Sequence, residues 1–195
     1  MALLRSSSSV SVQLRAKCIV AGDAAVGKSA LSQILHGEGN VSKTYSMTPG
    51  VEILTKVLQL PDSSNTVEML LYDSGGQPLF SDVVSKYWEN PSLLVIVYDV
   101  TNQDSFKNSS KWFDQVHSLA PNLTIPGVLV ANKTDLLERR AVTESEGRSL
   151  ASEKDLAYFE TSTKKSESCL APFLHLAKEY FKLYEEAVEV MKTIG

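Results

Sequence analysis

The stretch GDAAVGKSAL, Gly22 to Leu31, decides the fold class of this chain. It follows the apolar run KCIVA, Lys17 to Ala21, and leads into a segment whose apolar residues have helical spacing. Between a strand and a helix, the pattern G-x-x-x-x-G-K-[ST] forms a loop whose backbone N–H groups point at a phosphate. The simpler alternative is a glycine-rich turn with a surface lysine.

The loop predicts a distinct role for each part. Its backbone N–H groups converge on a β-phosphate, and Lys28 neutralises the β- and γ-phosphates. The hydroxyl of Ser29 ligates Mg²⁺. The candidate phosphate-binding residues are Ala24, Ala25, Val26, Gly27, Lys28, Ser29 and Ala30.

Composition and charge narrow the class of protein. The chain has 195 residues, of which 43% are hydrophobic and 22% charged, and a formal net charge of −4. These values are ordinary for one globular domain, and they give no basic footprint for nucleic acid or an anionic membrane. Cys18 and Cys169 form no C-x-x-C pair, so the sequence suggests neither a zinc site nor a disulfide framework. No apolar run approaches the roughly 20 residues of a transmembrane helix.

Apolar runs alternate with segments of helical pattern, which predicts an α/β fold with a doubly wound, mostly parallel sheet. The turn-rich segment PDSSN, Pro61 to Asn65, predicts a hairpin and thus one antiparallel edge strand. Strands are predicted over residues 14–21, 51–60, 66–72, 93–100, 127–132 and 156–160. Helices are predicted over residues 28–35, 105–119, 144–154 and 171–192, with Thr143 and Glu146 as a capping box for the third.

The two ends of the chain are predicted to differ. Residues 1–12, with a run of serines, are expected to form a flexible arm before a single domain at 13–195. The last helix has one apolar stripe and is roughly 30 Å long at 1.5 Å per residue. Its second half, EEAVEVMKTI at 185–194, is expected to extend beyond the domain, either as a frayed end or as a surface for a protein partner.

The second motif, DSGGQPLF at 73–80, follows a predicted strand. The carboxylate of Asp73 can hold Mg²⁺ through water, and Gly76 can offer its N–H to a γ-phosphate where a Cβ would intrude. Gln77 can orient an attacking water. Alone, the pattern D-x-x-G is often only a turn at the end of a strand. At the end of the buried strand that follows the phosphate loop and the hairpin, it becomes a strong indication of a nucleotide site.

The third motif, NKTD at 132–135, selects the base. The carboxylate of Asp135 can accept hydrogen bonds from the N1–H and 2-amino group of guanine, whereas adenine has neither donor. Such mismatches discriminate by roughly 10⁴. Asn132 is predicted to tie the base to the phosphate loop, and the stem of Lys133 to cover the purine.

The fourth motif, ETSTKK at 160–165, corroborates the third. The backbone N–H of Thr163 or its neighbour Lys164 can contact the guanine 6-oxo group, with Ser162 bracing Asp135. In the segment YSMTPGVEI at 45–53, Thr48 can give its hydroxyl to Mg²⁺ and its N–H to the γ-phosphate. Both contacts vanish on hydrolysis, so GTP is expected to order this segment and GDP to release it.

These four motifs, in this order over nearly the whole chain, resemble the Ras superfamily of small GTPases. The resemblance implies the P-loop NTPase fold with six strands and about five helices, GTP or GDP as ligand, and Mg²⁺. The segments TPGVEI at 48–53 and VIVYDVTNQDSF at 95–106 resemble the Rab and Rab-like branch, and most of all the Rab-like GTPases of the intraflagellar transport B complex. That implies a cytoplasmic protein of the cilium or flagellum and its basal body, a small β-sandwich subunit as partner of the last helix, and effectors at Thr48 and at 73–80.

The sequence departs from the family pattern at positions that affect GTP hydrolysis, nucleotide affinity and membrane attachment. Pro78 follows Gln77 and restricts its backbone. No arginine lies between Arg15 and Arg139, so neither of the two switch segments, 45–53 and 73–80, supplies an arginine finger. Such an arginine raises the rate of GTP hydrolysis by about 10³–10⁵. Val41 stands where relatives place an aromatic over guanine, a loss of about 1 kcal/mol. No cysteine follows Cys169, so no lipid anchor is expected.

The leading hypothesis is therefore a Mg²⁺-dependent GTP-binding switch that hydrolyses GTP slowly and relies on an external activating protein. Gln77, Lys28 and Thr48 are its candidate catalytic residues, and Ser29, Thr48 and Asp73 its metal ligands. An alternative is a structural subunit that uses guanine nucleotide mainly for stability, since a ligand at a thousand times its Kd adds about 4 kcal/mol. A P-loop ATPase is opposed by NKTD.

Overall fold

The computed structural model describes residues 11–37, 47–76, 81–121 and 124–194. The strands are β1 (Gln13–Ala21), β2 (Val51–Gln59), β3 (Thr66–Ser74), β4 (Leu93–Asp99), β5 (Gly127–Asn132) and β6 (Ala157–Glu160). The helices are α1 (Lys28–His36), α2 (Ser81–Lys86), α3 (Gln103–His117), α4 (Glu144–Glu153) and α5 (Ser166–Ile194), with a 3-10 turn, η2, at Leu137–Arg139.

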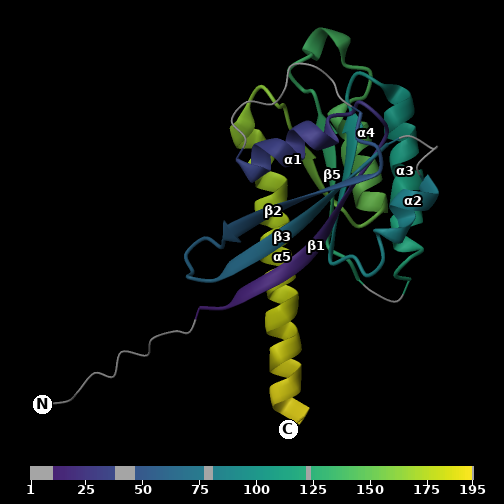
Figure 1. The fold of residues 1–195 in the computed structure, drawn as a ribbon. Helices are drawn as coiled ribbons and strands as arrows, with labels where there is room; N and C mark the ends of the chain where they lie inside the picture. The colour runs from purple at the N-terminus through teal and green to yellow at the C-terminus, as the bar shows by residue number, and fades with distance from the viewer. Residues whose placement is uncertain (1–10, 38–46, 77–80, 122–123, 195) are drawn as a thin grey trace, which may run out of the picture.

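One six-stranded sheet forms the centre of the domain, in the order β2-β3-β1-β4-β5-β6 (Figure 1). Strand β2 runs antiparallel to β3, and the remaining neighbours are parallel. The hairpin between β2 and β3 closes with a hydrogen bond from the Leu60 N–H to the Asn65 carbonyl, 3.0 Å. The predicted mostly parallel sheet with one antiparallel edge strand is confirmed.

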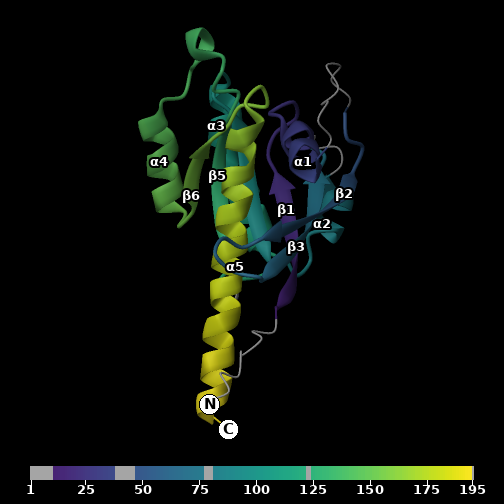
Figure 2. The ribbon, with the colours of Figure 1, turned by 90° about the vertical axis from the view of Figure 1, so that its left-hand side faces the viewer.

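Helices cover both faces of the sheet, which explains why β4 and β5 are buried along their whole length and apolar up to their last residues, Asp99 and Asn132. Leu31 of α1 and Phe173 of α5 belong to the core on one face. Val116 of α3 and Ala151 of α4 belong to the core on the other. Figure 2 shows α5 along its face of the sheet, with α4 on the other side of β6.

The predicted capping box of α4 is confirmed, because Thr143 and Glu146 bond each other's backbone N–H. Helix α3 starts at Gln103, two residues earlier than predicted. Its cap is Asn102, whose side-chain oxygen accepts hydrogen bonds from the N–H groups of Asp104 and Ser105. The short helix α2 was not predicted from the sequence.

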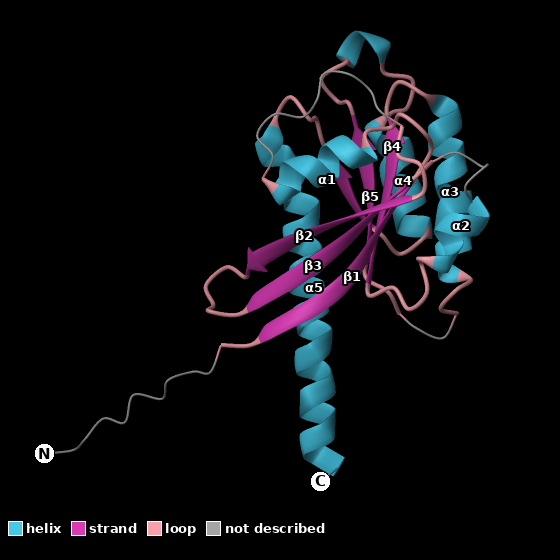
Figure 3. Ribbon diagram, viewed as in Figure 1, coloured by secondary structure: helices cyan, strands magenta, loops and turns pink. Residues whose placement is uncertain are grey.

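Helix α5 has 29 residues and starts five residues before the predicted Ala171. Pro172 lies inside it, past the first turn, and cannot donate the helical hydrogen bond to the carbonyl four residues earlier. Phe173 and Phe181 are buried, whereas Tyr184 is 38% and Met191 72% exposed. The second half of α5 therefore projects beyond the sheet, as predicted (Figure 3). Among the described residues, none of the helices is long and apolar enough to cross a membrane.

Candidate functional site

The phosphate loop joins the carboxyl end of β1 to the first turn of α1, so its N–H groups lie at a helix N-terminus. Ala25 and Gly27 have φ angles of +62° and +102°. A Cβ on Gly27 would collide with the side-chain amide of Asn132, so only glycine allows that close approach. The loop is therefore shaped by backbone geometry that few residue types adopt.

Lys28 lies across its own loop and is only 6% exposed. Its Nζ donates to the carbonyls of Gly22, 2.9 Å, and Asp23, 2.7 Å. Burial lowers the pKa of Lys28 to about 8, against the opposing effect of the Asp73 and Asp23 carboxylates. A nearby phosphate would favour the charged form, so the site suits an anionic ligand.

The three predicted metal ligands come together. The hydroxyls of Ser29 and Thr48 lie 3.0 Å apart, although 19 residues separate them in sequence. Asp73 is fully buried, and neither of its carboxylate oxygens has a hydrogen-bond partner in the described part of the chain. Burial raises the pKa of Asp73 to about 6, opposed by the nearby Ser29 hydroxyl and Lys28 ammonium. A buried, unsatisfied carboxylate near two hydroxyls fits Mg²⁺, which prefers oxygen ligands.

Gly76 rests directly on the phosphate loop. A Cβ on Gly76 would collide with the backbone of Gly22, Asp23 and Ala24. The adjoining Gly75 N–H donates to the Gly50 carbonyl, 2.6 Å, which joins this segment to the one that carries Thr48. Gln77, the candidate water-orienting residue, lies outside the described residues.

Asn132 connects the predicted base-binding loop to the phosphate loop. It is 1% exposed, and its Nδ2 donates to the Val26 carbonyl at 2.9 Å. Its Oδ1 accepts from the hydroxyl of Thr161 at 3.1 Å. Asn132 thus links the predicted base-binding loop to the phosphate loop, and the hydroxyl of Thr161 adds a brace that was not predicted.

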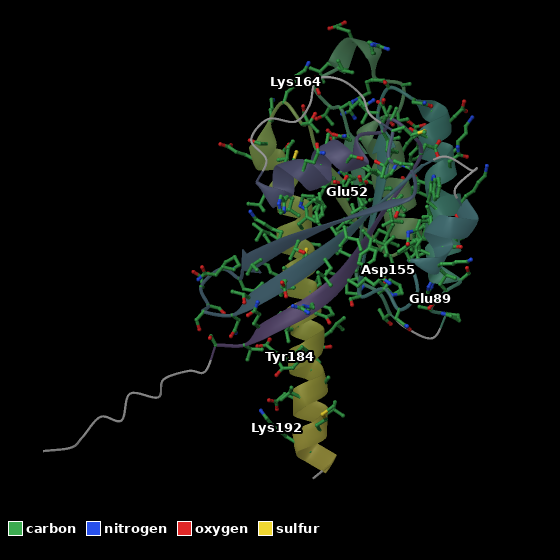
Figure 4. All side chains as sticks on the ribbon, viewed as in Figure 1. Glu52, Glu89, Asp155, Lys164, Tyr184 and Lys192 are labelled. Atoms are coloured by element: carbon green, nitrogen blue, oxygen red, sulfur yellow. The ribbon has the colours of Figure 1, made fainter. Side chains whose placement is uncertain are left out.

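Asp135 is held by two side chains. The Ser162 hydroxyl donates to its Oδ1 at 2.7 Å, which confirms the predicted brace. The Lys164 ammonium pairs with its Oδ2 at 2.6 Å, and this contact was not predicted. These hydrogen bonds, led by that of Lys164, lower the pKa of Asp135. Lys164 lies at the same end of the molecule as α1, as Figure 4 shows, and its side chain is 72% exposed.

Lys133 has a φ of +65°, and its ammonium pairs with Asp99 at 2.7 Å. This ion pair holds the side chain at the carboxyl end of β4, where Asp99 lies. Thr163 is half-buried beside them. Apart from Gln77, all of the predicted site residues thus lie at the carboxyl edge of the sheet, where ligands bind in open α/β folds.

One contact between the phosphate loop and α3 was not predicted from the sequence. The carboxylate of Asp23, within the phosphate loop, accepts hydrogen bonds from Asn108, 2.8 Å, and Trp112, 2.7 Å, both on α3. The available signal was a carboxylate placed where bound phosphates would repel it, which calls for a partner elsewhere in the fold.

Comparison with known proteins agrees with this geometry. The model of the Ras family matches residues 17–182, most of the chain. The chain belongs to the Ras family. Membership makes it a GTP-binding protein of the small GTPase class, which as a rule also binds Mg²⁺.

Several curated relatives align with this Ras-family chain over nearly its full length. A protein named intraflagellar transport protein 27 homolog, from Homo sapiens, is 48% identical over 94% of this chain and 100% of its own. Intraflagellar transport protein 27 of Chlamydomonas reinhardtii is 35% identical over 92% and 90%. The homolog from Trypanosoma brucei brucei is 33% identical over 91% and 96%.

Proposed function

We propose that this protein is a Mg²⁺-dependent guanine-nucleotide switch that hydrolyses GTP slowly and works as a subunit in intraflagellar transport. The observation that carries the proposal is the cluster of Asp73, Ser29 and Thr48. Within the described residues, the buried Asp73 carboxylate has no hydrogen-bond partner, and it stands beside two hydroxyls that are 3.0 Å apart. Such a carboxylate is costly unless a ligand compensates it.

The residues of the chain would share the work of binding as follows. Ser29, Thr48 and, through water, Asp73 hold the metal ion, which neutralises charge on the β- and γ-phosphates. Lys28 turns from the carbonyls of its own loop to the phosphates. Gly76 offers its N–H to the γ-phosphate at close range.

The base end of the site selects guanine. Asp135 accepts hydrogen bonds from the base, and Ser162 keeps the carboxylate oriented through the 2.7 Å hydrogen bond. The N–H groups of Thr163 and Lys164 face the 6-oxo group. Asn132 links base recognition to the phosphate loop through its bond to the Val26 carbonyl.

Slow hydrolysis follows from two features of the sequence. Pro78 limits the backbone of Gln77, the residue that orients water. No arginine lies between Arg15 and Arg139, so neither switch segment provides the positive charge that is worth about 10³–10⁵ in rate. An activating protein would supply the missing arginine.

The cellular setting comes from the relatives, whose names place them in intraflagellar transport. On that basis we propose a location in the cytoplasm, at the cilium or flagellum and its basal body. The projecting half of α5 would bind a protein partner, by resemblance a small β-sandwich subunit. It exposes Leu183, Tyr184, Val190 and Met191 by 38–72%. Effectors would bind near Thr48 and residues 73–80.

A second candidate is a structural subunit that keeps guanine nucleotide mainly for stability. The apolar surface of α5 favours it, because this surface lies far from the nucleotide site and suits a permanent partner. Comparing partner affinity in the GDP and GTP states separates the two candidates.

The experiment that tests the proposal is nucleotide exchange with fluorescent mant-GDP and mant-GTP, with and without Mg²⁺. We expect tight binding of both, faster release without Mg²⁺, and no competition by ATP. Asp73→Ala should abolish the Mg²⁺ effect, whereas the exposed control Asp62→Ala should keep it. Mg²⁺-independent binding in the unmodified protein would refute the metal site.

A further inference from the structure

The chain has two tryptophans, Trp88 and Trp112, and they contact each other. Their rings meet edge to face, with centroids 6.1 Å apart and an interplanar angle of 70°. Trp88 is fully buried just after α2, and Trp112 lies on α3. Buried indoles generally find a partner for their N–H, and each of these two bonds a different nucleotide-site segment.

The first partner lies in the phosphate loop. The Trp112 indole N–H donates to one carboxylate oxygen of Asp23 at 2.7 Å, and Asn108, one helical turn earlier, donates to the other at 2.8 Å. The backbone carbonyl of Asp23 in turn accepts from Lys28 at 2.7 Å. Helix α3 therefore fixes the loop residue on which the phosphate-binding lysine rests.

The second partner follows the metal-site carboxylate. The Trp88 indole N–H donates to the hydroxyl of Ser74 at 2.8 Å. The Ser74 hydroxyl in turn donates to the Tyr72 carbonyl at 3.1 Å. Ser74 lies two residues before Gly76, which packs on the backbone of Asp23.

These contacts connect the phosphate loop, through Trp112 and Trp88, to the segment that carries Ser74 and Gly76. We propose that Asp23, Trp112, Trp88 and Ser74 act as a contact path that positions the phosphate loop on α3 and transmits the presence of the γ-phosphate to that helix. This inference rests on the proposed function. A γ-phosphate held by the Gly76 N–H fixes the segment that carries Ser74, and its loss releases that segment. The Trp88–Ser74 bond and the geometry of the indole pair change with it.

The test has two readouts, since spatial proximity alone does not establish coupling. One is the rate of mant-GDP release. The other is intrinsic tryptophan emission, which comes only from Trp88 and Trp112, compared with bound GDP and with a non-hydrolysable GTP analogue. We expect the emission of the unmodified protein to differ between the two nucleotides.

The variants separate positioning from charge. Asn108→Asp sets a carboxylate against Asp23, and we expect GDP release about tenfold faster, equivalent to about 1.4 kcal/mol. The double variant Asp23→Asn with Asn108→Asp keeps the net charge. In it the new amide donates to residue 108 and its oxygen still accepts from Trp112, so GDP release should return to within about threefold of the original rate. Lys107→Ala, on the exposed side of α3, is the matched control.

Ser74→Ala isolates the other half of the path. It should leave GDP release within about threefold but remove most of the emission difference between the two nucleotides. A double variant that fails to restore GDP release overturns the positioning role. Emission that is identical with GDP and the analogue, while both bind, overturns the transmission and leaves the proposed function intact. If neither nucleotide binds, the proposed function fails and takes the inference with it.

Discussion

The substitution Asp135→Asn tests base recognition, and its magnitude can be worked from the site. It replaces one carboxylate oxygen with an NH₂ group, which sets a donor against the donors of guanine. The hydrogen bond to the replaced oxygen is lost, at about 1.5–3 kcal/mol, and the guanine donor that it satisfied is left facing another donor, at about 1–3 kcal/mol more, so the total cost is about 3–6 kcal/mol. The affinity for GDP should fall by about 10²–10⁴. The Lys164 pair changes this little, because the lysine is 72% exposed and solvent screens it.

The assay is equilibrium competition of mant-GDP by GDP and by xanthosine diphosphate. Xanthine carries a carbonyl where guanine has its amino group, so the Asp135→Asn variant should prefer xanthosine diphosphate. Lys164→Ala serves as a control, because it changes the charge near Asp135 but keeps the carboxylate. GDP affinity within twofold of the original in the Asp135→Asn variant would refute the assigned role.

Three further predictions concern the switch, stability and partner binding. Thr48→Ala should keep GDP affinity within about twofold but weaken binding of a GTP analogue about tenfold, near 1.4 kcal/mol; equal losses for both nucleotides would argue against a γ-phosphate contact. Glu160→Gln should cost about 1 kcal/mol in urea unfolding at pH 7, because it breaks the bidentate pair with Arg140 at 2.9 Å. Burial acts to raise the pKa of Glu160, but hydrogen bonds from Arg140 and Tyr158 outweigh it and hold that pKa below its ordinary value. The pair with Arg140 therefore contributes its full stability above the ordinary glutamate pKa, and this stability is lost as the pH falls through the lowered pKa of Glu160. A destabilisation by Glu160→Gln that persists in acid would contradict this role of the pair. Met191→Glu, 72% exposed on α5, should weaken partner binding at least tenfold with nucleotide affinity unchanged, whereas undiminished pull-down of the partner would exclude this surface.

Local sequence patterns predict much of the fold. The buried strands β4 and β5 are apolar runs up to their last residues, and the capping box at Thr143 marks the start of α4 with four consecutive residues. The loops that hold phosphate and base have fixed spacings because their backbones must converge on one ligand. The pairing of Asp135 with Ser162, across 27 residues, is therefore predictable from the sequence.

Other features depend on tertiary packing and leave no local mark. The indole of Trp112 donates a hydrogen bond to Asp23 across 89 residues, and no local pattern in either segment predicts that partner. Lys164 reaches Asp135 only because β6 brings its loop beside the base-binding loop. Helix α5 starts before Pro172, against its local preference, since Cys169 and Phe173 gain burial against the sheet.

Single-turnover hydrolysis of bound GTP tests the central claim most directly. Protein loaded with GTP and Mg²⁺ is followed for conversion to GDP, beside a Gln77→Leu variant. The account predicts slow hydrolysis in the original protein and a slower rate still in the variant, because Gln77 orients the attacking water. Equal and near-zero rates in both proteins would contradict a switch that resets itself, and would favour the structural role of the nucleotide.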